Sequence, residues 1–385
     1  MNPLLDVMIA EKGGKILQKV KVSGGGRCNV THACFDIREM SRRYPRGERF
    51  VRKAFYHFFT SDTIQWFQER GVPLKQEEDG RMFPEADTSQ AIVDCLTSEM
   101  NIYGVRLALH TAILKIQPQQ EGFNIMLGGG QSLYADFVVV ATGGFSRLDQ
   151  LDWLKNLNLT METPVPSLFT FNFPGHPLNQ LMGVVAPECS ISIAGTRFCA
   201  EGPVLITHWG LSGPAILRLS AFAARELAQR NYQFTVVVNW CCTYNEQTFT
   251  EKIRHERSAV PSRKVINGNF TGLASRLWEH LLNISGIDNN RRWADLTVSM
   301  MNKLSRNCCA YVMTASGKTT FKEEFVSAGG ISLTEIEPDT MMSKKYPGLY
   351  FAGEVMDVDG ITGGYNFQHA WTSGYIAACH ISSRS

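Results

Sequence analysis

Apolar and polar residues are distributed along this chain in two distinct patterns. Short apolar runs, of which Asp6–Ala10 and Phe137–Ala141 are the clearest, predict buried strands of a parallel sheet. Apolar residues spaced by three and four positions predict one or two helices within Phe50–Gly71. The same spacing predicts a helix at Ser89–Tyr103, with Thr88 or Ser89 as its N-cap. Such strands and helices together predict an α/β core.

The middle of the chain has a different character. Three short segments predict a β-meander attached to a doubly wound core: Val105–Leu109, Ala112–Gln117 and Phe123–Leu127. From about Pro164 the sequence is proline-rich and alternating, which is typical of a mainly β domain. Residues 245–305 have a polar, helical pattern, and apolar strands with glycine turns return after Phe321.

These changes of pattern predict a discontinuous first domain. We expect it to comprise residues 1–162 and 321–385, interrupted by an insert at 163–320. Within the insert we expect a β-rich part at 163–244 and a helical part at 245–308. A chain of 385 residues is long enough for two hydrophobic cores.

The net charge of +2 gives no general reason to expect a polyanionic partner, so nucleic acid is not expected. One local exception is Arg38–Lys53, where seven cations stand against two glutamates. A solvated helix face is the simpler interpretation of this stretch, and RNA binding is the alternative.

The ten cysteines include no C-x-x-C pair, which favours neither a zinc site nor a disulfide framework, so we expect no metal. A reducing cytoplasm fits this cysteine usage best. The N-terminal residues do not form a signal peptide pattern, and no segment reaches the roughly 18 apolar residues of a membrane span. We therefore expect a cytoplasmic protein without a membrane partner; the oligomeric state is left open.

Four separated features predict a dinucleotide-type ligand. Glu11 follows a strand, as does the carboxylate that binds ribose hydroxyls in dinucleotide folds. The stretch Ser23–Asn29, "SGGGRCN", offers bare backbone and a cation to a pyrophosphate or a flat ring. Within it, Cys28 is interpreted as a packed thiol beside the ligand.

The third and fourth features lie at the ends of later strands. "FVVVATGG" places Thr142 and two glycines where open α/β sheets bind ligands. "GLYFAGEVMDVDGITGGYNFQHAW" combines a strand, Glu354, a glycine turn and a helix. The amides that begin this helix, around Gly364–Asn366, would face a phosphate or the pyrimidine edge of a flavin.

The sequence resembles the HI0933-like flavoproteins, also described as the BaiN/RdsA type of FAD-dependent oxidoreductase. The matching stretches are "EKGGKILQKVKVSGGGRCNVTH", "GRMFPEA", "VVVATGG", "THWGLSGPAIL", "FVSAGGISL" and "GLYFAGEVMDVDGITGGYNFQHAW". The resemblance implies a glutathione-reductase-type, Rossmann-like FAD-binding domain that is discontinuous, with an inserted β-rich and helical domain capping the flavin.

The resemblance also implies which residues contact FAD. Glu11 and Lys12 would bind the adenosine ribose. The ribityl and ring side would be bounded by Ser23, Gly24, Gly25, Gly26, Arg27, Cys28 and Asn29. The adenosine–pyrophosphate half would lie near Ala141, Thr142 and Gly143. The pyrophosphate and the pyrimidine edge would be surrounded by Gly353, Glu354, Gly363, Gly364, Tyr365, Asn366 and Gln368.

Two departures from the family pattern affect this expectation. The chain shows no first strand with a G-x-G-x-x-G turn before Asp6, so about one β-turn-α unit is absent from the sequence. The segment after Gly144 is also shorter than in many relatives. We expect the neighbours of the absent strand to keep unpaired edges and this polypeptide to bind FAD weakly or not at all.

Flavin chemistry requires few side chains, so the sequence does not single out a catalytic set. Candidates for substrate contact or proton transfer are His208, Arg81 and His369. The resemblance implies an FAD-dependent oxidoreductase acting on a small molecule, with NAD(P)H as a candidate reductant. The alternatives are a flavoprotein that modifies tRNA or binds RNA, and a truncated non-enzyme without cofactor.

Overall fold

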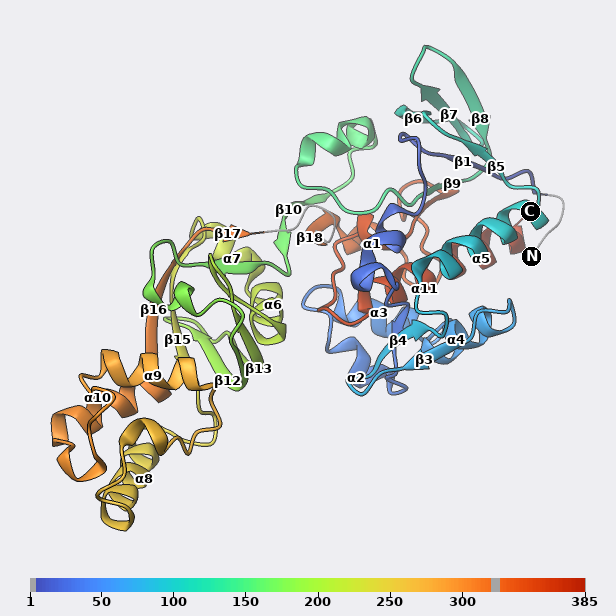
Figure 1. Cartoon of the computed structure of the whole chain (residues 1–385). Coiled ribbons are helices and arrows are strands. Elements are labelled where there is room, and N and C mark those ends of the chain that lie inside the picture. The colour runs from blue at the N-terminus through green and yellow to red at the C-terminus, as the bar shows by residue number, and fades with distance from the viewer. Residues whose placement is uncertain (1–4, 320–325, 385) are drawn as a thin grey trace. The chain divides into compact units, whose positions relative to one another are not determined.

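The computed structural model describes residues 5–319 and 326–384, which form two compact units (Figure 1). The first unit contains residues 5–167 and 326–384, and the second contains residues 168–319. The chain leaves the first unit after β10 (Met161–Ser167) and returns in β18 (Val326–Ile331), and the two strands pair antiparallel. The sequence predicts that the first domain's first segment ends at residue 162. Because β10 pairs with β18, the first unit continues to Ser167 instead.

Two parallel strand pairs form the centre of the first unit. They are β1 (Met8–Ala10) with β5 (Arg106–Ala108), and β9 (Val138–Val140) with β19 (Leu349–Phe351). Among the described residues each pair is a complete two-stranded sheet, so β1 and β9 each keep one edge without a strand partner. Val7, Ile9 and Val139 are 44%, 39% and 44% exposed, although parallel sheets are ordinarily buried. The structure thus shows the unpaired edges that the sequence predicts.

Helices and two small antiparallel sheets complete the first unit. Its α-helices are α1 (Gln18–Gly26), α2 (Ile37–Ser41), α3 (Glu48–Ala54), α4 (Thr60–Gln68), α5 (Ser89–Ile102) and α11 (Tyr365–Arg384). One sheet has the order β2 (Thr31–His32), β4 (Arg81–Pro84), β3 (Leu74–Gln76). The meander has the order β6 (Ile113–Pro118), β7 (Phe123–Leu127), β8 (Ser132–Ala135). The prediction was wrong for Val105–Leu109, because β5 in that segment pairs parallel with β1 and the third meander strand is β8. Short 3₁₀ segments are η1 (Leu148–Leu157), η5 (Leu333–Glu335) and η6 (Gly353–Val355).

Local sequence explains where the longer helices begin. Thr88 is the N-cap of α5, and its hydroxyl accepts a hydrogen bond from the amide of Gln90. The predicted aromatic helix region divides into α3 and α4, and the Asp62 carboxylate accepts from the amide of Phe59 at the start of α4. A buried cluster beneath α1 and α5 includes Cys28 and Phe67.

The second unit is built on a seven-stranded antiparallel sheet. The strand order is β16 (Tyr311–Ser316), β15 (Gln233–Asn239), β12 (Val185–Ile193), β13 (Cys199–Ile206), β14 (Gly210–Ser212), β11 (Thr170–Asn172), β17 (Lys318–Thr319). The helices are α6 (Pro214–Phe222), α7 (Ala224–Gln229), α8 (Glu246–Ala259), α9 (Ser275–Ile284) and α10 (Val298–Cys309), with 3₁₀ segments η2 (Pro177–Leu181), η3 (Val265–Asn267) and η4 (Trp293–Asp295). One large apolar core unites the sheet with these helices.

Pro214 occupies the first position of α6, where its lack of an amide hydrogen costs no hydrogen bond. After α10 the chain returns to the sheet as β16, which alternates buried and exposed residues. No helix within residues 5–319 and 326–384 combines the length and the apolar character needed to cross a membrane.

Candidate cofactor site

Glu354 connects three of the four sequence features. Its carboxylate accepts a hydrogen bond of 3.0 Å from the amide of Ser327 and forms an ion pair with Lys19 on α1. A Cβ at Gly144, in the loop after β9, would lie 2.5 Å from the Glu354 Oε1. A side chain at position 144 would displace the Glu354 carboxylate, and Glu354 joins α1, the loop after β9 and the 3₁₀ turn η6.

The triple glycine contains two kinds of position. All three glycines have left-handed φ, at 58°, 68° and 85° for Gly24, Gly25 and Gly26. A Cβ on Gly24 would lie 2.8 Å from the Phe83 ring and 2.9 Å from the Asn29 amide nitrogen, so the fold itself requires this glycine. A Cβ on Gly25 or Gly26 would meet nothing within 4 Å. These two residues present bare backbone to open space.

Gly143 has the same properties, with a φ of 74° and no atom within 4 Å of the place that a Cβ would occupy. It follows β9, and Glu11 follows β1, so both lie at the carboxyl ends of parallel strands. Ala141, Thr142 and Lys12 are exposed beside them. The Glu11 carboxylate accepts from the amide of Gly13 at 2.6 Å. Bare backbone after β9 and a carboxylate after β1 are groups that a dinucleotide cofactor binds, although the two strands belong to separate sheets.

Cys28 and Asn29 turn the chain after the glycines. Cys28 is fully buried with a φ of 63°, and burial raises the pKa of its thiol to about 11. Its position agrees with the predicted packed thiol. With its amide nitrogen oriented toward the Thr31 and Met82 carbonyls, Asn29 accepts through its oxygen from the Gly364 amide at 3.0 Å. This contact joins the triple-glycine stretch to the C-terminal glycine turn.

The two glycine stretches lie against each other along β2. A Cβ on Gly364 would be 2.5 Å from the Thr31 backbone, so the close approach excludes any side chain there. His32 Nδ1 lies 3.1 Å from the Gly363 carbonyl oxygen, and its ring stacks on Tyr365 with centroids 4.8 Å apart. Burial lowers the pKa of His32. His32 directly follows the glycine stretch and is not among the site residues predicted from the sequence.

Gln368, a predicted cofactor contact, is fully buried, and its side-chain amide forms hydrogen bonds with other residues of the protein. Its Oε1 accepts from the Thr31 hydroxyl at 2.6 Å and from the Thr63 hydroxyl at 3.0 Å. Its Nε2 donates to the Thr372 hydroxyl at 3.1 Å. The network ties α11 to β2 and α4, which assigns Gln368 a structural role.

Asn366 and Tyr365 shape the loop before α11. The Asn366 Oδ1 accepts from the amide of Gly360 at 2.8 Å, and its Nδ2 donates to the Gly360 carbonyl at 3.1 Å. The Tyr365 carbonyl accepts from the Tyr44 hydroxyl at 2.6 Å. This loop therefore has a fixed backbone shape, as binding through amides requires.

A buried ion pair holds the same loop from the other side. Asp359 is fully buried, and its carboxylate accepts from two nitrogens of the Arg46 guanidinium and from the Ser167 hydroxyl. Burial raises the pKa of Asp359, and Arg46 and Ser167 oppose that shift. The loop, the α2–α3 segment and the end of β10 thus meet at one carboxylate.

The two arginines selected from the sequence share an acidic partner. Arg27 lies over the Phe83 ring at 4.0 Å and donates to the Glu77 Oε1 at 2.6 Å. Arg81 donates to the same Glu77 at 3.0 Å and to Asp79 at 2.7 Å. Both guanidinium groups already pair with carboxylates of the protein, so neither arginine offers an uncompensated charge to an anionic ligand.

The two candidate histidines lie in different units. His369 is buried on α11, and burial lowers its pKa to about 4 although the Gly353 backbone opposes that shift. It is therefore neutral near pH 7. His208 is exposed on the loop between β13 and β14 of the second unit, with its ring centroid 4.0 Å from that of Trp209.

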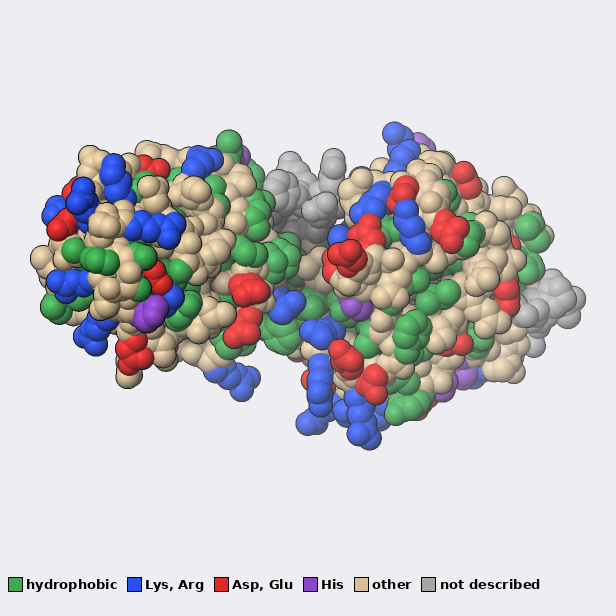
Figure 2. All heavy atoms as spheres, turned by 60° about the horizontal axis from the view of Figure 1, so that its bottom comes forward, with side chains coloured by type: hydrophobic (Ala, Val, Ile, Leu, Met, Phe, Trp, Pro, Cys, Tyr) green, Lys and Arg blue, Asp and Glu red, His purple; other side chains and the backbone are tan. Residues whose placement is uncertain are grey.

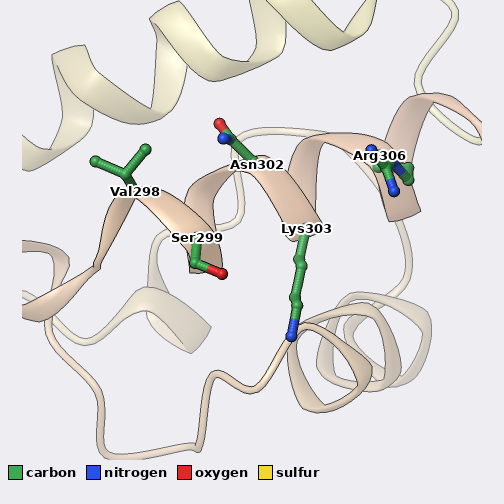
Figure 3. A pocket seen from close by; sticks show the side chains of 5 residues that line it. All are labelled: Val298, Ser299, Asn302, Lys303 and Arg306. Carbon is green, nitrogen blue, oxygen red and sulfur yellow. The ribbon is translucent and has the colours of Figure 1, made fainter.

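A surface pocket on the second unit contains none of the predicted site residues. All the side chains that line it belong to α10: Val298, Ser299, Asn302, Lys303 and Arg306 (Figure 3). They follow one exposed side of a single helix, and in Figure 3 the Lys303 side chain extends away from that of Asn302. This open hollow does not have the form of a cofactor site.

Comparison with known proteins identifies related chains. The ribosomal RNA dihydrouridine synthase of Escherichia coli (strain K12) is 30% identical over 388 residues, covering 97% of this chain and 91% of that protein. The 3-dehydro-bile acid delta(4,6)-reductase of Clostridium scindens is 26% identical, covering 98% of this chain and 93% of that protein. The solved 3-ketosteroid delta1-dehydrogenase of Sterolibacterium denitrificans is 14% identical with a TM-score of 0.49, covering 100% of this chain and 96% of that one.

A family profile, described as the HI0933-like protein Rossmann domain, matches residues 2–380. This match confirms both the family and the Rossmann-type α/β fold class predicted from the sequence. The glycine stretches and strand ends described above lie within the matched range. The chain therefore belongs to the HI0933-like family.

Proposed function

We propose that this protein is an FAD-dependent oxidoreductase that reduces a carbon–carbon double bond conjugated to a carbonyl group. The observation that carries this proposal is the bare backbone at Gly25, Gly26 and Gly143, where left-handed glycines face open space. Backbone of this kind admits a pyrophosphate or a flat ring that any side chain would exclude. FAD, when bound, supplies hydride transfer.

The bond class follows from the chemistry named by two relatives. Dihydrouridine is uridine whose ring double bond, conjugated to a carbonyl, has been saturated, and one relative is named for making it. Another is named as a delta(4,6)-reductase of a 3-dehydro bile acid, whose 3-keto group is conjugated to the double bonds it removes. Both reactions add a hydride to one alkene carbon and a proton to the other. We infer the same class of reduction here, with NAD(P)H as the reductant.

The residues of this chain would position the reactants. Glu354 and Lys19 hold the loop after β9 against α1. Asn29 and Asn366 fix the two glycine stretches.

The test is an anaerobic assay at saturating FAD, with NADPH or NADH and two probes that carry such a bond. The probes are a 3-keto-4,6-diene steroid and a short RNA that contains uridine. We expect FAD-dependent oxidation of the reduced nicotinamide and loss of the conjugated absorbance of one probe. A Gly26→Val variant should lose this activity. Absence of FAD-dependent turnover with both probes, in protein shown to be folded, would overturn the proposal.

A further inference from the structure

The segment that forms α2 and α3 carries a group of cations that are exposed or, at Arg52, half-buried. We call it the α2–α3 basic surface; it consists of Arg38, Arg42, Arg49, Arg52 and Lys53, with Phe35 and Tyr56 beside the two helices. Figure 2 looks onto the side of the first unit where α2 lies and shows Lys and Arg side chains gathered there.

The charges of this surface are not neutralised within the protein. Of the seven cations in Arg38–Lys53, Arg43 pairs with Glu39 and Arg46 pairs with Asp359. The other five form no ion pair with any residue in the ranges 5–319 and 326–384. A chain with a net charge of only +2 thus concentrates free positive charge at one place.

The helix α3 arranges its cations on one face. Arg52 and Lys53 lie three and four positions after Arg49, so these three cations share one side of the helix. Tyr56 follows the end of the helix at Ala54. The opposite side, with Phe50 and Ala54 among others, is buried. The basic side is therefore the side that faces solvent.

Two exposed aromatic rings accompany the cations. Phe35 is 61% exposed and Tyr56 is 73% exposed. Aromatic rings beside a cationic groove stack on unpaired bases and contribute about 1–3 kcal/mol per base. Cations alone suit any polyanion, whereas cations with exposed rings favour a single-stranded nucleic acid.

The α2–α3 basic surface adjoins the candidate cofactor site. The amide of Ile361 donates to the Arg43 carbonyl at 2.9 Å, and the Tyr44 hydroxyl donates to the Tyr365 carbonyl at 2.6 Å. Both contacts join the segment between α2 and α3 directly to the glycine loop before α11. A strand bound on this surface would pass beside that loop.

We propose that the α2–α3 basic surface binds the backbone of an unpaired RNA strand and that the base to be reduced is carried in this strand. The proposal rests on the proposed function and names its substrate class. The expectation that nucleic acid is not a partner depended on the charge of the whole chain; the distribution of that charge favours RNA. The solvated helix face remains the competing interpretation.

The experiment measures binding of a fluorescently labelled RNA hairpin with a uridine-rich loop, by anisotropy, without FAD or nicotinamide. The variant Arg42→Gln/Arg49→Gln/Lys53→Gln removes three cations from the surface. Because each lost phosphate contact on a single strand lowers the salt slope by about 0.7, we expect the slope of log K against log salt to fall by about 2. Affinity at low salt should fall at least about tenfold.

The matched control is Arg254→Gln/Arg257→Gln/Lys303→Gln, which removes the same charge from exposed positions on α8 and α10. It should leave the affinity and the slope close to those of the parent protein. Tyr56→Ala should weaken binding without changing the salt slope, since stacking is not ionic. Equal losses in the control, or no binding by the parent protein at low salt, would overturn the proposal.

Two further outcomes separate this proposal from the proposed function. Binding that depends on the α2–α3 basic surface, with no reduction of any probe, would support the surface and contradict the reductase. Reduction of the steroid probe with no RNA binding would support the reductase and contradict the surface. Phosphatidylserine vesicles that bind the parent protein and are not displaced by RNA would assign the surface to a membrane and overturn the RNA proposal.

Discussion

Arg46 holds the fully buried carboxylate of Asp359 through two guanidinium nitrogens, across more than three hundred positions of sequence. The Ser167 hydroxyl donates to the same carboxylate at 2.8 Å. One buried anion therefore fixes the cofactor loop, the segment between α2 and α3, and the end of β10. Removing one member of a buried pair leaves the other charge without compensation.

We predict that Asp359→Ala lowers the free energy of unfolding by about 3–5 kcal/mol, as measured by urea denaturation. The control is Asp339→Ala, which removes the carboxylate that lies 3.1 Å from His57 in an exposed pair. That change should cost less than about 1 kcal/mol. Equal costs for the two variants would show that the Asp359 pair does not anchor the loop.

The triple glycine allows cofactor contact to be separated from backbone strain. Gly25→Ala should cost about 1–2 kcal/mol of stability, because only its left-handed φ resists a side chain. Gly24→Ala should cost more, because it also meets Phe83 and Asn29. Gly130→Ala is the matched control, with a φ of 82°, open surroundings and a place in the turn between β7 and β8.

FAD affinity, measured by quenching of flavin fluorescence, should fall at least about tenfold in Gly25→Ala and stay unchanged in Gly130→Ala. Such a result would distinguish a cofactor contact from general destabilisation. Unchanged FAD affinity in Gly25→Ala would place the cofactor away from this loop.

His369 makes stability depend on pH in a defined direction. Its pKa in the folded protein is about 4, below the ordinary value of 6.5, so the unfolded chain binds more protons between these values. Stability should therefore fall as the pH falls through this window. From pH 7.5 to pH 5 the loss due to His369 should be about 2 kcal/mol.

A His369→Leu variant isolates this contribution from the other histidines. We expect the free energy of unfolding of this variant, measured by urea denaturation at several pH values, to fall less from pH 7.5 to pH 5 than that of the parent protein. The two losses should differ by about 2 kcal/mol. Parallel pH profiles for the two proteins would mean that His369 does not titrate as its burial requires.

The unpaired edges of β1 and β9 bear on FAD retention. Dinucleotide sites use the carboxyl ends of neighbouring parallel strands, and here the two parallel pairs are separate sheets. We predict that the polypeptide of 385 residues binds FAD weakly and retains little of it when it is purified without added cofactor. Visible absorbance per mole of protein measures this directly, and a stoichiometric flavin spectrum would contradict it.

The same edges predict self-association. Val139 in β9 and Val7, which directly precedes β1, have exposed apolar side chains at strands with an unpaired edge. Such edges are the usual template for pairing with another chain. Light scattering on warming should decrease in a Val7→Lys/Val139→Lys variant. Faster aggregation of this variant at equal thermal stability would show that the edges are not the cause.

Elements defined by local pattern were predictable from the sequence. Thr88 marks the start of α5, and the apolar runs of β1 and β9 indicate parallel strands, because these signals need only neighbouring residues. The helix α1 was not predicted, since its residues Gln18–Gly26 lack a strong apolar face and end in glycines. The strand β16 was also missed because it follows directly on a helical stretch.

The contacts that assemble the site were not predictable in this way. His32 meets Gly363, and Asn29 meets Gly364, only because β2 packs against a turn more than three hundred residues later. Gln368 was assigned to the cofactor from its place in a motif, yet its amide is used by Thr31 and Thr63. A motif identifies residues near a site, whereas the fold decides which of their atoms are still available.

The pairing of β10 with β18 makes the second unit a removable module. Ser167 and Val326 are direct partners across the two strands, so their backbones lie about 5 Å apart. A two-residue turn of the Asn-Gly type closes such a pair without strain. Joining Ser167 to Val326 through this turn would yield a continuous first unit, in which a hairpin replaces the entire intervening sequence.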